Sequence, residues 1–170
     1  MTIPPHLRKF ALTAHVTSSV GWLGAIVAFL ALAIVGLTSQ DAQMVRAVYL
    51  AAEPITWFVI VPLALASLLT GIVQSLGTKW GLFRHYWVLF KLLLTVLATI
   101  VLLMYTQTVS YFAGIAAEPG ASLGELRAPT FVLHSGGGLL ALLVTTVLAV
   151  YKPRGRTRYG RRKQQEERRK

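Results

Sequence analysis

The feature that most constrains the fold of this sequence is a set of four apolar stretches, each long enough to cross the hydrocarbon core of a bilayer. That core is about 30 Å thick and takes roughly 20 residues at the helical rise. The stretches run over Phe10–Leu37, Ile55–Leu76, Tyr86–Tyr105 and Ala128–Tyr151, and the only formally charged residue within them is Lys91. Backbone polar groups in lipid must be satisfied inside the segment, so helices are predicted rather than open strands.

The predicted fold class is an all-α membrane protein, a four-transmembrane-helix bundle formed by residues 1–151. A hydrophobic content of 55% supports this class. The absence of cysteine excludes disulfides and thiolate metal sites. A soluble-type hydrolase is disfavoured because the sequence lacks a nucleophile elbow, a phosphate-binding loop and a His-Glu-x-x-His motif. Whether the chain is an enzyme stays open.

The orientation of the bundle is predicted from its basic residues, which favour the cytoplasmic side of short loops. Arg8 and Lys9 precede the first apolar stretch, and Lys79 and Arg84 lie between the second and the third. A basic tail follows the fourth. Both termini are therefore predicted to be cytoplasmic.

The tail, residues 152–170, holds ten of the seventeen Lys and Arg residues. It has almost no apolar side chains to bury, so we expect it to be disordered. Anionic lipid headgroups would attract it by about 1 kcal/mol per basic residue near the surface. The basicity of the chain thus predicts a lipid surface, and not nucleic acid, as the partner. The residues assigned to the membrane surface are Arg154, Arg156, Arg158, Arg161, Arg162 and Lys163.

His15 and Lys91 are predicted to meet inside the bundle, because they lie at similar depths from the cytoplasmic ends of their helices. Lys91 is about six residues, or roughly 9 Å, from the start of its helix. His15 shares a face with Ser18, Ser19 and Trp22 at helical spacing. An ammonium group at this depth costs up to about 3 kcal/mol, so it should snorkel, pair, lose its proton or bind something. The two residues are our candidates for holding a cofactor.

A second candidate site lies near the outer side. His134 precedes three glycines that let a neighbouring helix or a flat ligand come close. Glu53 and Met104 fall near the outer ends of their own stretches. From ligand types alone, His134, Glu53 and Met104 are a candidate metal site.

Three segments carry a resemblance to known proteins: AHVTSSVGWLG (14–24), SLGTKWGLFRHYWVLFKLLLTVLAT (75–99) and HSGGGLLALLVTTVLAVYKPRG (134–155). Together they resemble an actinobacterial family of uncharacterised four-helix membrane proteins, which implies the plasma membrane of a bacterium. More distantly, the histidine before Trp-x-Gly and the lysine opening Lys-Leu-Leu are similar to HemJ-type protoporphyrinogen oxidases. That likeness would give His15 and Lys91 haem-associated positions and imply haem b as cofactor. The His before Trp-Leu-Gly is also similar to CopD-type proteins, which implies copper import.

Three functional hypotheses remain open at this point. The first is a non-enzymatic four-helix membrane protein, or a component of a larger assembly with a second copy or another membrane protein. The second is a haem-binding or redox protein that uses His15 and Lys91. The third is transport of a metal or a small solute, although no carboxylate lies within a span.

Overall fold

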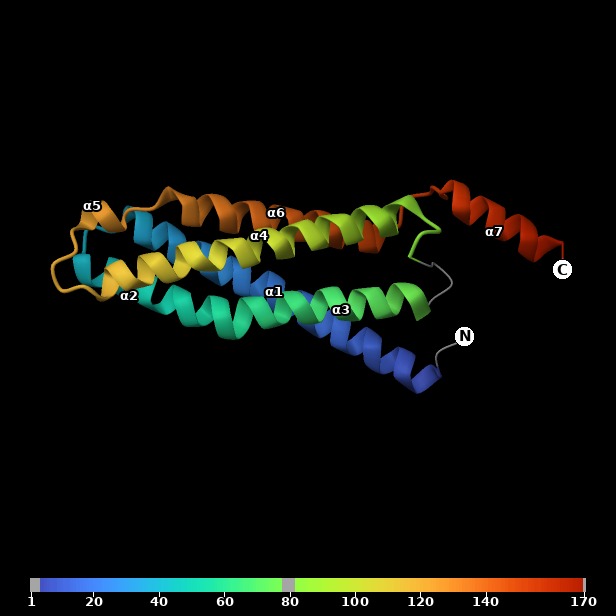
Figure 1. Cartoon of the computed structure of the whole chain (residues 1–170), viewed down its shortest axis with the longest axis horizontal. Helices are drawn as coiled ribbons and strands as arrows, with labels where there is room; N and C mark the ends of the chain where they lie inside the picture. Colours follow the sequence, from blue (N-terminus) through green and yellow to red (C-terminus); the bar gives the residue numbers. More distant parts are fainter. Residues whose placement is uncertain (1–3, 78–81, 170) are drawn as a thin grey trace.

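The computed structural model describes residues 4–77 and 82–169, and this part of the chain is helical without a β-strand (Figure 1). Its helices are α1 (Pro5–Thr38), α2 (Ala42–Ile55), the π-helical turn η1 (Thr56–Ile60), α3 (Val61–Gly77), α4 (Tyr86–Ala117), α5 (Leu123–Leu126), α6 (Pro129–Tyr151) and α7 (Arg158–Arg168). Within the described residues, four helical runs are long and apolar enough to cross a membrane: α1, α2 to α3, α4, and α5 to α6. The predicted four-helix architecture is confirmed.

The four runs form an elongated bundle whose two ends differ (Figure 1). The N-terminal end of α1 and helix α7 lie at one end, and α5 lies at the other. Helix α1 packs on α3 and α6, and α4 packs on the same two helices. Helices α1 and α4 therefore face each other diagonally across the bundle interior.

The helices extend beyond the apolar stretches that predicted them. The second run begins at Ala42, where the Asp41 side chain accepts hydrogen bonds from the amides of Gln43 and Met44. Helix α4 continues past Tyr105 to Ala117. Hydropathy marks the part of a helix that suits lipid, whereas caps and packing decide where the helix ends. The connections from α1 to α2 and from α4 to α5 are therefore shorter than predicted.

The second run contains a break in its regular hydrogen bonding between its two prolines. Pro54 directly precedes the predicted stretch Ile55–Leu76 but lies inside the helical run, and Pro62 lies in the first turn of α3. Between them η1 has the wider π-helical turn, in which the amide of Val61 donates to the Thr56 carbonyl. Proline lacks an amide hydrogen, which explains why the α-helical ladder is interrupted here.

The end of the bundle that carries α5 is held by an aromatic cluster and one arginine. The cluster brings together rings from four helices: Phe29, Tyr49, Tyr105, Phe112 and Phe131. Beside it, the Arg46 guanidinium donates to the carbonyls of Glu118, Pro119 and Ala121 at 2.6, 3.1 and 2.9 Å. These bonds tie α2 to the turn that follows α4.

The basic tail differs from the disordered segment that its composition predicted, because α7 forms within it. Thr157 caps α7 by accepting from the Gly160 amide at 3.0 Å, and its own amide donates to the Arg84 carbonyl at 3.1 Å. A side chain at Gly160 would clash with that carbonyl. Composition does not predict this helix, because α7 depends on a cap and a close backbone contact and not on apolar burial. Lys79 and Lys170 lie outside the described residues.

Candidate functional site

A cavity of about 580 Å³ lies between α1, α3, α4 and α6, toward the end of the bundle that carries the N-terminus. We call it the polar cavity, and both His15 and Lys91 line it. Hydroxyl side chains from all four helices contribute to its wall: Ser19, Ser67, Ser75, Thr95, Thr145 and Thr146. The structure thus brings the two residues of matched depth to one cavity from diagonally opposed helices.

The imidazole of His15 is oriented by α3. Its Nδ1 lies 3.1 Å from the Ser67 carbonyl and 3.2 Å from the Thr70 hydroxyl. The Thr70 hydroxyl already donates to the Ala66 carbonyl, and the Ser67 carbonyl can only accept. Nδ1 must therefore carry the proton and donate to both oxygens, which leaves Nε2 as the ring nitrogen without a bond to α3.

The approach of α1 to α3 at this point depends on Gly71. A Cβ placed there would lie 3.0 Å from Cε1 of His15, closer than side chains normally tolerate. One turn away, the hydroxyls of Ser19 and Ser67 are 2.7 Å apart and join the same two helices. Small residues therefore allow a close, hydrogen-bonded contact, as in other membrane helix pairs.

Lys91 is half-buried, and no described residue that lines the same cavity carries a compensating negative charge. No carboxylate is among the described residues that line the polar cavity, where the other lysine is Lys152. The Lys91 ammonium makes no hydrogen bond or ion pair with the described part of the chain; the nearby Thr95 hydroxyl contacts only the Lys91 backbone carbonyl, at 2.8 Å. The cavity consequently combines an amine that can carry a positive charge with hydroxyl groups from four helices.

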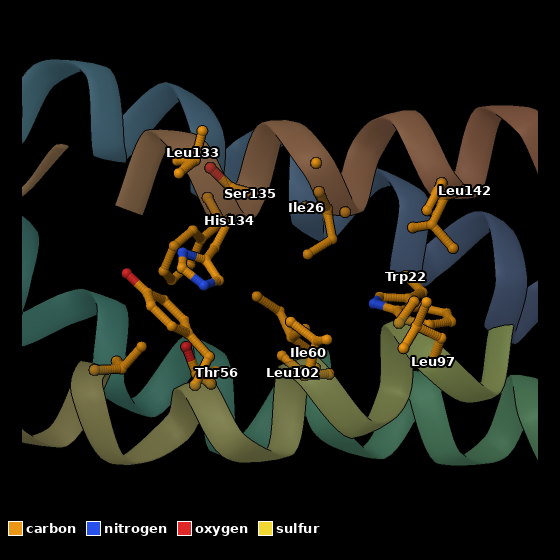
Figure 2. A pocket seen from close by; sticks show the side chains of 18 of the residues that line it. Trp22, Ile26, Thr56, Ile60, Leu97, Leu102, Leu133, His134, Ser135 and Leu142 are labelled. Carbon is orange, nitrogen blue, oxygen red and sulfur yellow. The ribbon is translucent and has the colours of Figure 1, made fainter. Parts of the chain in front are cut away.

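A second cavity of about 310 Å³, which we call the apolar cavity, lies farther along the bundle (Figure 2). It is lined mainly by aliphatic side chains, together with Tyr105, His134 and the glycine pair Gly137 and Gly138. Trp22 and Leu142 line both cavities, so the two cavities are neighbours in the bundle.

The candidate metal ligands do not converge on this cavity. His134 lines it, but neither Glu53 nor Met104 does, and the Met104 side chain is 71% exposed. His134 is instead engaged by Thr130, whose carbonyl is 2.9 Å from Nδ1, and its ring stacks on Tyr105 with centroids 4.0 Å apart. Among the described residues there is no group of three His, Asp or Glu side chains that could hold a metal. Ligand type alone had suggested a site that the geometry does not assemble.

The contribution of α3 to the polar cavity is the part that sequence reasoning missed. Ser67, Thr70, Gly71 and Gln74 recur at three- and four-residue intervals in an otherwise aliphatic segment. Such spacing places them on one face of a helix, so this stripe was the available signal. Length and hydropathy alone do not reveal it, because the stretch stays apolar on average.

The chain matches no protein-family model, no curated protein and no solved structure. Its resemblance to actinobacterial, HemJ-type and CopD-type membrane proteins therefore stays a prediction, as does a haem ligand role for His15 and Lys91. Function has to be argued from the geometry of the two cavities.

Proposed function

We propose that this protein is a multi-pass integral protein of a bacterial plasma membrane, with both termini cytoplasmic, whose polar cavity binds an anionic amphiphile at Lys91. The observation that carries the proposal is the Lys91 amine, which lines a cavity to which no described residue contributes a carboxylate. The basic residues near the N-terminus and in the tail support the orientation.

An anion is the partner that the cavity needs. A charge removed from water and left without a counterion is destabilising, and a bound carboxylate would form a charge-assisted hydrogen bond to the lysine. Ser19 and Gln74 line the same space and can donate to an anionic oxygen, because the Ser19 hydroxyl is bonded only to Ser67 and Nε2 of Gln74 has no partner among the described residues. The head of the ligand would thus be bound by polar groups from three helices.

The rest of the ligand is expected to be apolar. Leu12, Val16 and Val20 of α1 also line the cavity, and each is about half exposed or more on the surface of the bundle that would face lipid. A hydrocarbon chain can leave the cavity along these side chains without meeting water. A fatty acid has the required carboxylate and chain, and binding it requires no catalysis, in keeping with a non-enzymatic membrane protein.

Haem in the polar cavity would be bound differently from a fatty acid, and the difference allows the two hypotheses to be tested against each other. His15 would have to ligate iron through Nε2, because Nδ1 donates to the Ser67 carbonyl and the Thr70 hydroxyl. Lys91 would have to lose its proton before its amine could ligate. An absorption spectrum of the purified protein distinguishes a haem from a colourless fatty acid.

Replacing Lys91 with methionine is expected to weaken binding of a dansyl-labelled fatty acid roughly 10- to 100-fold, because a hydrogen bond to a charged group contributes about 1.5–3 kcal/mol. The measurement is saturable dansyl fluorescence with the protein in nanodiscs of neutral lipid, corrected for empty nanodiscs. Lys163→Met is the matched control, since Lys163 is exposed on α7. Equal affinities for wild type and Lys91→Met, or an equally tight dansyl-labelled alcohol, would contradict the proposal.

The orientation can be tested with a reporter enzyme that is active only outside the cytoplasm. Gly120 lies in the turn between α4 and α5, and a side chain there would meet open space, so an insertion should be tolerated. We expect activity from a reporter inserted at Gly120 and silence from one fused to the C-terminus. The reverse pattern would show that the basic loops lie outside.

A further inference from the structure

Trp22 holds a hydrogen-bond donor without a partner in the interior of the bundle. Its side chain is only 3% exposed, and the indole Nε1 finds no acceptor in the described part of the chain. Figure 2 shows this nitrogen directed into the apolar cavity, toward the space beside Ile26 and Ile60. Buried indole N–H groups usually have a partner, so this donor indicates an acceptor that enters the cavity from outside the chain.

The neighbouring hydroxyl groups do not serve as that acceptor. The Thr56 hydroxyl donates to the Ala52 carbonyl at 2.8 Å, and the Ser135 hydroxyl donates to the Phe131 carbonyl at 2.6 Å. Both side chains line the cavity, yet both are bonded to their own helices. The Trp22 donor is therefore available to a ligand.

The wall of the apolar cavity indicates what kind of ligand can enter. Leu97 and Val101 of α4 and Leu133 of α6 line it and are 55%, 42% and 73% exposed, so it opens between these helices on the surface that would face lipid. A molecule arriving by that route must dissolve in hydrocarbon. On α6, a Cβ added at Gly137 or Gly138 would meet nothing within 4 Å, which leaves room for a flat group against the helix backbone.

We infer that the apolar cavity is a second binding site, for an uncharged, lipid-soluble carbonyl compound whose oxygen accepts a hydrogen bond from Nε1 of Trp22. The lipid-facing opening requires a ligand that dissolves in hydrocarbon. The glycine pair leaves room for a flat ring, and the indole N–H requires a carbonyl oxygen as its acceptor. This site does not depend on the anion at Lys91, because Lys91 lines the polar cavity and is not among the residues that line the apolar cavity.

Decylubiquinone is a suitable probe, since it has ring carbonyls and a saturated tail. We expect saturable binding to the protein in nanodiscs, beyond partition into empty nanodiscs, and a carbonyl infrared band moved to lower wavenumber by the indole hydrogen bond. Trp22→Phe keeps an aromatic ring but removes the donor. It should abolish the band shift and weaken binding roughly fivefold, the effect of losing one ordinary hydrogen bond.

Two glycine variants test the location independently of Trp22. Gly138→Leu should fill the cavity and abolish binding, whereas Gly136→Leu should preserve it, because Gly136 is not among the lining residues and also has open space for a side chain. Lys91→Met should leave quinone binding unchanged while it weakens fatty-acid binding. The two proposals can therefore fail independently of each other. The inference is overturned if binding is not saturable, if the band shift survives in Trp22→Phe, or if both glycine variants bind alike.

Discussion

Truncating Phe131 to alanine is expected to destabilise the bundle by about 2–6 kcal/mol, because its ring pairs with four others and each aromatic pair contributes about 0.5–1.5 kcal/mol. Phe131 is 1% exposed and is the centre of the aromatic cluster. Its ring is stacked on Phe29 at 5.9 Å and meets Tyr49 edge-on at 4.9 Å. Tyr105 and Phe112 contact it edge-on from α4. The truncation would remove contacts to three helices at once.

The loss should come from packing and not from transfer out of water, because membrane helices associate chiefly through close contact. Phe58→Ala is the matched control: Phe58 is 80% exposed in η1 and its ring would face lipid. Reversible unfolding by titration with a denaturing detergent should separate the two variants clearly. If Phe131→Ala lost no more stability than Phe58→Ala, the cluster would not be a main source of cohesion between the helices.

Hydropathy was sufficient to predict the number and class of the helices, because a span without charges leaves few alternatives in lipid. It could not predict their ends. Helix α2 begins at Ala42, where the Asp41 side chain caps it, and α4 reaches Ala117 while Arg46 bonds the carbonyls beyond it. Helix α7 likewise depends on Thr157 and Gly160. These are local hydrogen bonds and close contacts, to which a hydropathy window is insensitive.

The candidate site was predictable in part for a similar reason. The depth of a residue in a helix follows from its distance in sequence from the helix end, so His15 and Lys91 were expected at one level of the bundle. In the structure they line one cavity. Which helix would orient the imidazole depends on the packing of α1 against α3, which sequence alone did not specify. The candidate metal ligands rested on the same kind of argument, and of the three only His134 lines the apolar cavity.

Replacing Gly71 with leucine is expected to displace His15 and so to remove the feature that fixes the polar cavity. Even the Cβ would lie 3.0 Å from Cε1 and 3.5 Å from Nδ1 of the imidazole, and the longer side chain would occupy the place of the ring. Overpacking of a well-packed site costs typically about 1–3 kcal/mol. The ring would also lose its bonds to the Ser67 carbonyl and the Thr70 hydroxyl.

Nitrogen-15 NMR of the histidine side chains measures the protonation and hydrogen bonding of the His15 ring nitrogens directly. The His15 signals are assigned by comparison with His15→Gln. Wild type should show a protonated, hydrogen-bonded Nδ1, because both of its oxygen neighbours act as acceptors. Gly71→Leu should lose that signature, while Gly24→Leu should retain it, since a side chain at Gly24 of α1 meets nothing within 4 Å. An unchanged Nδ1 signal in a folded Gly71→Leu variant would mean that α3 does not orient His15, and the fixed imidazole would then have to be explained by α1 alone.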